Sequence, residues 1–171
     1  APSKRSGKCE AAMKGILKVA AKSPEAAIRG LFAKWLKENR LSAILTPAYS
    51  ASGTATMALV SNPEKLAEAA PLMPAMGVNS ASIVAEIARE SSPNAKVGLF
   101  LRSCELRAVV ELMKLRQVLP DSLVLIGVDC PGTYKAAGFR NVRGTDADFD
   151  NKHVRKQSGY ADDVNFRMGC Q

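Results

Sequence analysis

The sequence has few aromatic residues and lacks any long apolar run. Aromatic side chains make up only 5% of its 171 residues, so base stacking on an aromatic platform is poorly supported and a nucleic-acid partner is not expected. No apolar stretch approaches the roughly 18 residues of a membrane-spanning helix, so no membrane span is expected. The basic N-terminal segment has only a short apolar stretch interrupted by lysines, which predicts a helix over residues 9–22 instead of a signal peptide.

Close cysteine pairs and a phosphate-binding loop are also missing. The four cysteines, at positions 9, 104, 130 and 170, form no C-x-x-C pattern, and nothing indicates secretion. We therefore predict a reduced, cytoplasmic protein in which any functional cysteine is a metal ligand or a redox thiol. The segment YSASGTAT lacks the lysine of a P-loop. The single histidine, His153, has no nearby cysteine or recognisable nucleophile, so it is expected to be exposed to solvent.

Apolar residues and positive charge are both well represented. Hydrophobic residues make up 47% of the chain, close to the globular average, so a core built mostly from aliphatic side chains is expected. The formal net charge of +8 is compatible with an anionic partner or with solubility alone. Basic residues near the C-terminus predict a solvated basic face, with contact to an anionic cofactor as the alternative; they are Arg140, Arg143, Lys152, Arg155 and Lys156.

The first half of the chain shows alternating helix and strand patterns. Ser23 followed by a proline and a glutamate predicts a helix start, and the apolar stripe of that helix contains Ile28, Leu31, Phe32, Trp35 and Leu36. The segment LSAILTP predicts a short strand stopped by Pro47, and TATMALV predicts a second strand, so the two form a hairpin or adjacent strands. Asn62 is expected to begin a short helix, and residues 80–90 predict another.

The clearest unit follows: a strand over 96–101, a helix over 104–118 and a strand over 122–128. Two apolar runs separated by a helix of this length predict a βαβ unit with parallel strands. The expected fold is α/β, with a small mixed or parallel sheet flanked by helices. We expect a basic helical segment over 1–22, a core domain over 23–134 and a loop-rich or partly disordered tail over 135–171.

Two cysteines follow the two predicted parallel strands. The carboxyl ends of parallel strands meet at one edge of the sheet, where α/β proteins bind their ligands, so Cys104 and Cys130 are expected on the same edge. Ser103 is the predicted N-cap of the intervening helix. Cys104 would then lie in the first helical turn, where backbone N–H groups and the helix dipole favour a thiolate.

Charged neighbours act on this thiol in opposite directions. Arg102 and Arg107 favour a thiolate, whereas Glu105 opposes it unless it pairs with an arginine. The residues alone leave four interpretations open: an iron ligand, a redox thiol, a phosphate held by Arg102 and the helix N-terminus, or an inert buried cysteine. Without a histidine partner for Cys104, a thiol enzyme is the last of the functional alternatives.

The segment LRSCELRAVVELMKL, followed by LIGVDCPGTY, resembles the coenzyme F420 hydrogenase/dehydrogenase beta subunit family. This family includes beta subunits of some formate dehydrogenases and proteins associated with heterodisulfide reductase. The resemblance runs from about residue 28 to residue 134 and more loosely to the end. It implies an oxidoreductase subunit, an iron–sulfur flavoprotein that passes electrons between a catalytic subunit and a flavin, deazaflavin or ferredoxin-like carrier.

The resemblance also implies roles for individual residues. Cys104, Cys130 and Cys170 would be ligands of a 4Fe–4S cluster, and the cofactor-binding residues would be Arg102, Ser103, Arg107, Asp129, Gly132 and Thr133. The terminal FRMGCQ is similar to the opening of a cluster motif that continues with further cysteines in relatives. We therefore expect an N-terminal fragment without a complete active site. The alternative function is a nucleotide- or phosphate-binding regulatory module without redox activity.

Overall fold

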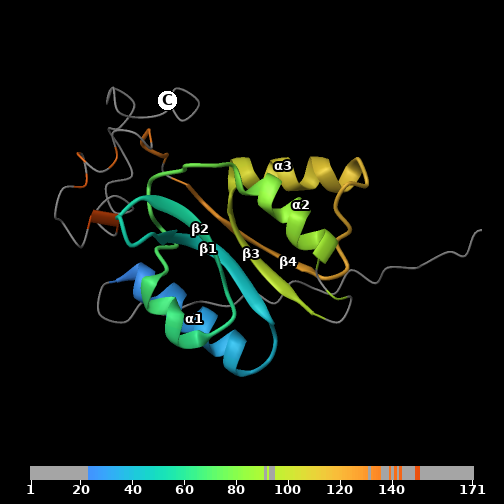
Figure 1. The fold of residues 1–171 in the computed structure, drawn as a ribbon, viewed down its shortest axis with the longest axis horizontal. Helices are drawn as coiled ribbons and strands as arrows, with labels where there is room; N and C mark the ends of the chain where they lie inside the picture. The colour runs from blue at the N-terminus through green and yellow to red at the C-terminus, as the bar shows by residue number, and fades with distance from the viewer. Residues whose placement is uncertain are drawn as a thin grey trace, which may run out of the picture.

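The protein, described from a computed structural model, is built around a four-stranded sheet with helices on both faces (Figure 1). The structure describes residues 23–90, 92, 95–130, 132–135, 139, 141, 143 and 149–150. The strands are β1 (Ala43–Tyr49), β2 (Ala55–Val60), β3 (Val97–Arg102) and β4 (Leu123–Val128), in the order β2-β1-β3-β4. Because β2 is antiparallel to β1 while β3 and β4 are parallel to their neighbours, the sheet is mixed, and the predicted α/β fold is confirmed.

Among the elements that the structure describes in full, three α-helices and one 3-10 helix cover the sheet. Helix α1 (Pro24–Lys37) lies on one face, and α2 (Ser80–Glu90) and α3 (Ser103–Lys114) lie on the other (Figure 1). The 3-10 helix η2 spans Pro63–Glu68. Several predictions concern residues outside the described ranges: the helix over 9–22, His153, Cys170 and most of the tail.

Two of these helices have a short polar residue as the N-cap, as predicted. The Ser23 hydroxyl accepts a hydrogen bond from the Ala26 backbone N–H at 3.2 Å. The Asn62 side chain accepts one from the Glu64 N–H at 2.9 Å, and the helix that follows is 3-10 rather than α. Both caps satisfy N–H groups that have no partner within the helix.

The predicted hairpin is confirmed, but the prediction that Pro47 ends the first strand is wrong. β1 continues through Pro47, which lies opposite Met57 of β2. Its parallel pairing with β3 ends at Leu45, so the missing proline N–H removes no bond from that ladder. The Pro47 carbonyl instead accepts a hydrogen bond from the Ala70 N–H at 2.8 Å.

The βαβ unit formed by β3, α3 and β4 is confirmed, with a shorter helix than predicted. The helix ends at Lys114 because Arg116 adopts a left-handed backbone conformation with φ of 57°. The Arg116 N–H then donates to the Met113 carbonyl, and the Gln117 N–H donates to the Leu112 carbonyl. This pattern is a Schellman motif, formed here without the glycine that usually marks it in a sequence.

Two apolar cores lie on the opposite faces of the sheet. Alternate residues of β3 point to opposite faces, so Leu99 packs with α2 and α3 whereas Phe100 packs with α1. All six residues of β3 are buried, as expected for a central strand covered on both sides. Among the described residues, no helix has the length and apolar character needed to cross a membrane.

A third, smaller apolar cluster packs aromatic residues from the chain after β4 against the end of β1. Phe139 is 2% exposed, and its ring stacks on Tyr49 at a centroid distance of 6.4 Å. Phe149 packs against Tyr134, with ring centroids 6.0 Å apart. Arg143 lies half-buried over the Tyr49 ring, with Cζ 4.1 Å from the ring centroid, so the prediction that it belongs to a solvated basic face is wrong. Part of the segment predicted as a tail therefore packs on the end of β1.

Candidate functional site

The carboxyl ends of β3 and β4 place two thiols along one edge of the sheet. In the parallel register, Arg102 at the end of β3 lies opposite Val128 at the end of β4. Cys104 and Cys130 each follow this pair by two residues. The Cys104 side chain is exposed, and the Cys130 side chain is half-buried. Cys104 is accessible from solvent in the first turn of α3, which is where the sequence predicted it.

The prediction that Ser103 caps α3 is wrong. β3 continues through Arg102, which is the N-cap residue in extended conformation, and Ser103 is already the first helical residue. The capping function falls to Glu105, whose carboxylate accepts a hydrogen bond from the Arg102 backbone N–H at 3.0 Å. A glutamate at this position satisfies a backbone donor and places negative charge at the positive end of the helix dipole.

Glu105 also connects α3 to α2. Its side chain is 1% exposed, and it accepts hydrogen bonds from the Ser80 hydroxyl at 2.5 Å and the Ser80 N–H at 3.3 Å. It lies 3.7 Å from the Arg102 guanidinium. Glu105 is therefore paired with an arginine, the condition under which it would not oppose a thiolate at Cys104, and the pair is enclosed within the protein.

The Arg102 guanidinium is bound to the connector between η2 and α2. Its Nη2 atom donates to the carbonyls of Met73 at 2.7 Å and Ala75 at 2.9 Å, and the residue is 5% exposed. The Tyr134 N–H donates to the intervening carbonyl of Pro74 at 2.7 Å. Because the guanidinium is buried, bound to two carbonyls and paired with Glu105, Arg102 fixes the shape of the site edge and is poorly placed to bind an anion.

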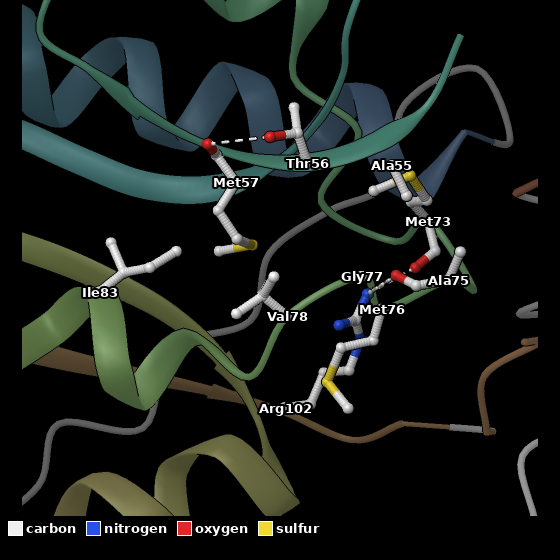
Figure 2. A pocket seen from close by; sticks show the side chains of 10 residues that line it. All are labelled: Ala55, Thr56, Met57, Met73, Ala75, Met76, Gly77, Val78, Ile83 and Arg102. Carbon is white, nitrogen blue, oxygen red and sulfur yellow. Dashed lines mark hydrogen bonds between the residues drawn. The ribbon is translucent and has the colours of Figure 1, made fainter. Parts of the chain in front are cut away.

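A small apolar pocket lies next to this guanidinium. It has a volume of about 110 Å³. Figure 2 shows the Arg102 side chain directed toward the Met73 and Ala75 carbonyls, with Met57 and Ile83 on the other side of the pocket. Ligand pockets usually measure roughly 300–1,000 Å³, so this pocket is too small for a flavin ring system. The sequence reasoning missed the pocket, although the two methionines of PLMPAM were a signal for it.

The other predicted site residues differ in exposure. Arg107 and Asp129 are exposed, whereas Gly132 and Thr133 are buried. Gly132 has φ of 109°, a conformation that favours glycine, and this turn leads into the pairing of Tyr134 with Ala75. Gly132 and Thr133 thus belong to the segment after β4 that brings the chain back to pair with the connector at Ala75.

The described residues do not by themselves fit an iron–sulfur cluster. Within the described ranges, no group of three or more His, Cys, Asp or Glu side chains is arranged to hold a metal ion. A 4Fe–4S cluster needs four ligands, and this edge offers two thiols, Cys104 and Cys130. The third predicted ligand, Cys170, lies outside the described residues.

The comparisons with known proteins assign no family to this chain. A scan against protein-family models finds no match, and a search of curated proteins finds none.

Proposed function

We propose that the chain is a subunit of a cytoplasmic electron-transfer complex, and that the carboxyl edge of β3 and β4 faces the redox centre. The observation that supports this proposal is the register of Arg102 with Val128, which brings Cys104 and Cys130 to the same edge. Ligands of α/β sheets bind at this edge, and thiolates are the usual protein ligands of iron–sulfur clusters.

The resemblance of LRSCELRAVVELMKL and LIGVDCPGTY to the F420 hydrogenase/dehydrogenase beta subunit family supports the same proposal. Under it, Cys104 and Cys130 are the thiols next to the centre, and the remaining ligands come from outside the described residues or from another chain. The partners would be a catalytic subunit and a flavin, deazaflavin or ferredoxin-like carrier. The contribution of Glu105 would be to fix the first turn of α3, and with it the position of the exposed Cys104.

A phosphate- or nucleotide-binding role at the start of α3 has less support. The cation expected to hold the phosphate, Arg102, is bound to two backbone carbonyls and lies next to the Glu105 carboxylate. A buried carboxylate in the first helical turn repels an anion that approaches the same N–H groups. The exposed Arg107 is the remaining predicted cation at this place.

The redox proposal predicts a bound chromophore. Full-length protein purified without oxygen is expected to absorb in the visible range, to contain iron and sulfide or flavin, and to bleach reversibly when dithionite is added. The measurement is a visible spectrum before and after reduction, with chemical assays of iron, sulfide and flavin on the same sample. A colourless preparation without iron or flavin would contradict the redox role, and a saturable thermal shift with nucleotides in that preparation would favour the regulatory alternative.

A further inference from the structure

The outer edge of the sheet at β4 is apolar and lacks the features that usually protect an edge strand. β4 is the last strand in the order β2-β1-β3-β4 (Figure 1), and none of the described strands pairs with its outer side. Its sequence, LVLIGV, has no charged residue and no proline, and its register with β3 is continuous, without a bulge. Because an unpaired strand edge pairs readily with another chain, an edge of this kind is expected to be covered in the working protein.

Alternate residues of β4 present their backbone groups to the outer side. The Val97 N–H of β3 donates to the Ser122 carbonyl at 2.8 Å. Residues that bond to one neighbouring strand alternate along a parallel ladder, so Leu123, Leu125 and Gly127 face outward. The Leu123 N–H is already used in the turn before the strand. The carbonyls of all three residues and the N–H groups of the last two therefore have no partner among the described residues.

These outward groups are complementary to a second copy of themselves. Leu125 is the central member of the set, so an antiparallel copy of β4 can pair Leu125 with its own equivalent about a two-fold axis. In the same register, Leu123 pairs with Gly127 of the second copy. The glycine has no side chain to compete with the leucine for space, and glycines in strands often mark such a close approach of another chain.

The side chains of β4 would meet apolar side chains on both faces of the joined sheet. Val124 and Leu125 point to opposite faces, and each is 37% exposed. In the two-fold register, Val124 lies opposite Ile126 of the second copy, and no charged side chain of β4 is brought against another. Leu115 and Leu119, which are 66% and 65% exposed, add apolar surface in the connection that leads into the strand.

We propose that two copies of this protein associate through β4, so that their sheets join into one continuous sheet. A second copy is the occupant that this edge specifies, because the backbone groups, the apolar pairs and the glycine all match about one two-fold axis. The net charge of +8 opposes association weakly, since no charge lies on β4 and salt screens charges more than about 8–10 Å apart.

This association is independent of the redox role. Because the two β4 strands run antiparallel, the carboxyl edges that carry Cys104 and Cys130 open in opposite directions. Each copy would keep its own thiol edge accessible to a cofactor or to a redox partner.

Sedimentation equilibrium of the purified protein measures its oligomeric state. The protein is studied at about 5–500 µM, the range in which interfaces of modest size dissociate, with a reducing agent that prevents disulfides through the exposed Cys104. We expect the mass to rise with concentration from one chain to two and then to stay constant. A single chain across the whole range overturns the proposal, and growth beyond two chains overturns the two-fold register.

Two substitutions at the axis locate the interface. Leu125→Lys and Leu125→Glu each place two like charges directly opposite one another, which is expected to weaken association by about tenfold or more. An equimolar mixture of the two variants should regain the dimer, because a lysine then faces a glutamate. Leu59→Lys is the control, since Leu59 is an exposed leucine on β2, the other edge strand, and it should associate like the wild-type protein.

Circular dichroism verifies that each variant is folded, and hydrogen–deuterium exchange of the wild-type protein gives a second test that needs no variant. The Leu125 and Gly127 amides are expected to exchange more slowly at high than at low protein concentration, whereas the amides of β2 should not change. Undiminished association of both folded Leu125 variants, loss of association in Leu59→Lys alone, or unchanged exchange at Leu125 and Gly127 would each overturn the assignment to β4.

Discussion

Replacement of Glu105 by alanine is expected to lower the free energy of unfolding by about 3–5 kcal/mol, the usual cost of removing one partner of a buried ion pair. The carboxylate is almost fully buried and accepts hydrogen bonds from Ser80 on α2 and from the Arg102 N–H at the end of β3. Without it, the Arg102 charge remains buried without its carboxylate partner. The first turn of α3, which carries Cys104, would lose its connection to α2.

Urea denaturation followed by circular dichroism measures this change. Glu111→Ala is the control on the same helix, because Glu111 forms an exposed pair with Lys114. Exposed pairs contribute about 0–1 kcal/mol, so this control should be close to the wild-type protein. A loss below about 1 kcal/mol for Glu105→Ala would contradict the structural role given to this carboxylate, because removal of one partner of a buried pair is strongly destabilising.

Replacement of Phe32 by alanine is expected to cost about 3–5 kcal/mol, as for other large residues deleted from a core. Phe32 is 1% exposed, and its ring meets Phe100 of β3 edge-on at a centroid distance of 5.3 Å. The contact attaches α1 to the central strand, so its loss leaves a cavity on that face of the sheet.

Thermal and urea unfolding of Phe32→Ala should both show this loss. Leu115→Ala serves as the control, because Leu115 is a large apolar residue that is 66% exposed, and exposed substitutions usually change stability by less than about 0.5 kcal/mol. Equal stability losses in the two variants would mean that the apolar core on the α1 face is not packed as described.

Local patterns in the sequence predicted the framework of the fold. The Ser23 cap and the apolar stripe that includes Phe32 gave α1 correctly, and apolar runs separated by a helix gave the βαβ unit. Errors arose where distant segments decide the outcome. Pro47 is tolerated because β3 has already ended its pairing with β1, and the left-handed Arg116 ends α3 without a glycine signal.

The candidate site was predictable in its position but not in its interactions. In the sequence, Arg102 stands two residues before Cys104, which suggests a cation that stabilises the thiolate. The structure instead binds the guanidinium to the carbonyls of Met73 and Ala75, which lie more than 25 residues earlier in the chain. The stacking of Phe139 on Tyr49 likewise requires a return of the chain from beyond β4 to β1, and no local periodicity predicts such a return.

The measurement that bears most directly on the redox role compares four proteins purified in parallel without oxygen: the wild-type protein and its Cys104→Ser, Cys130→Ser and Cys9→Ser variants. Iron, sulfide and flavin are assayed per chain in each. If the edge of β3 and β4 faces the redox centre, the Cys104 and Cys130 variants lose most of the cofactor found in the wild-type protein, while the Cys9 variant retains it. Full cofactor content in both edge variants would contradict the proposed role of that edge.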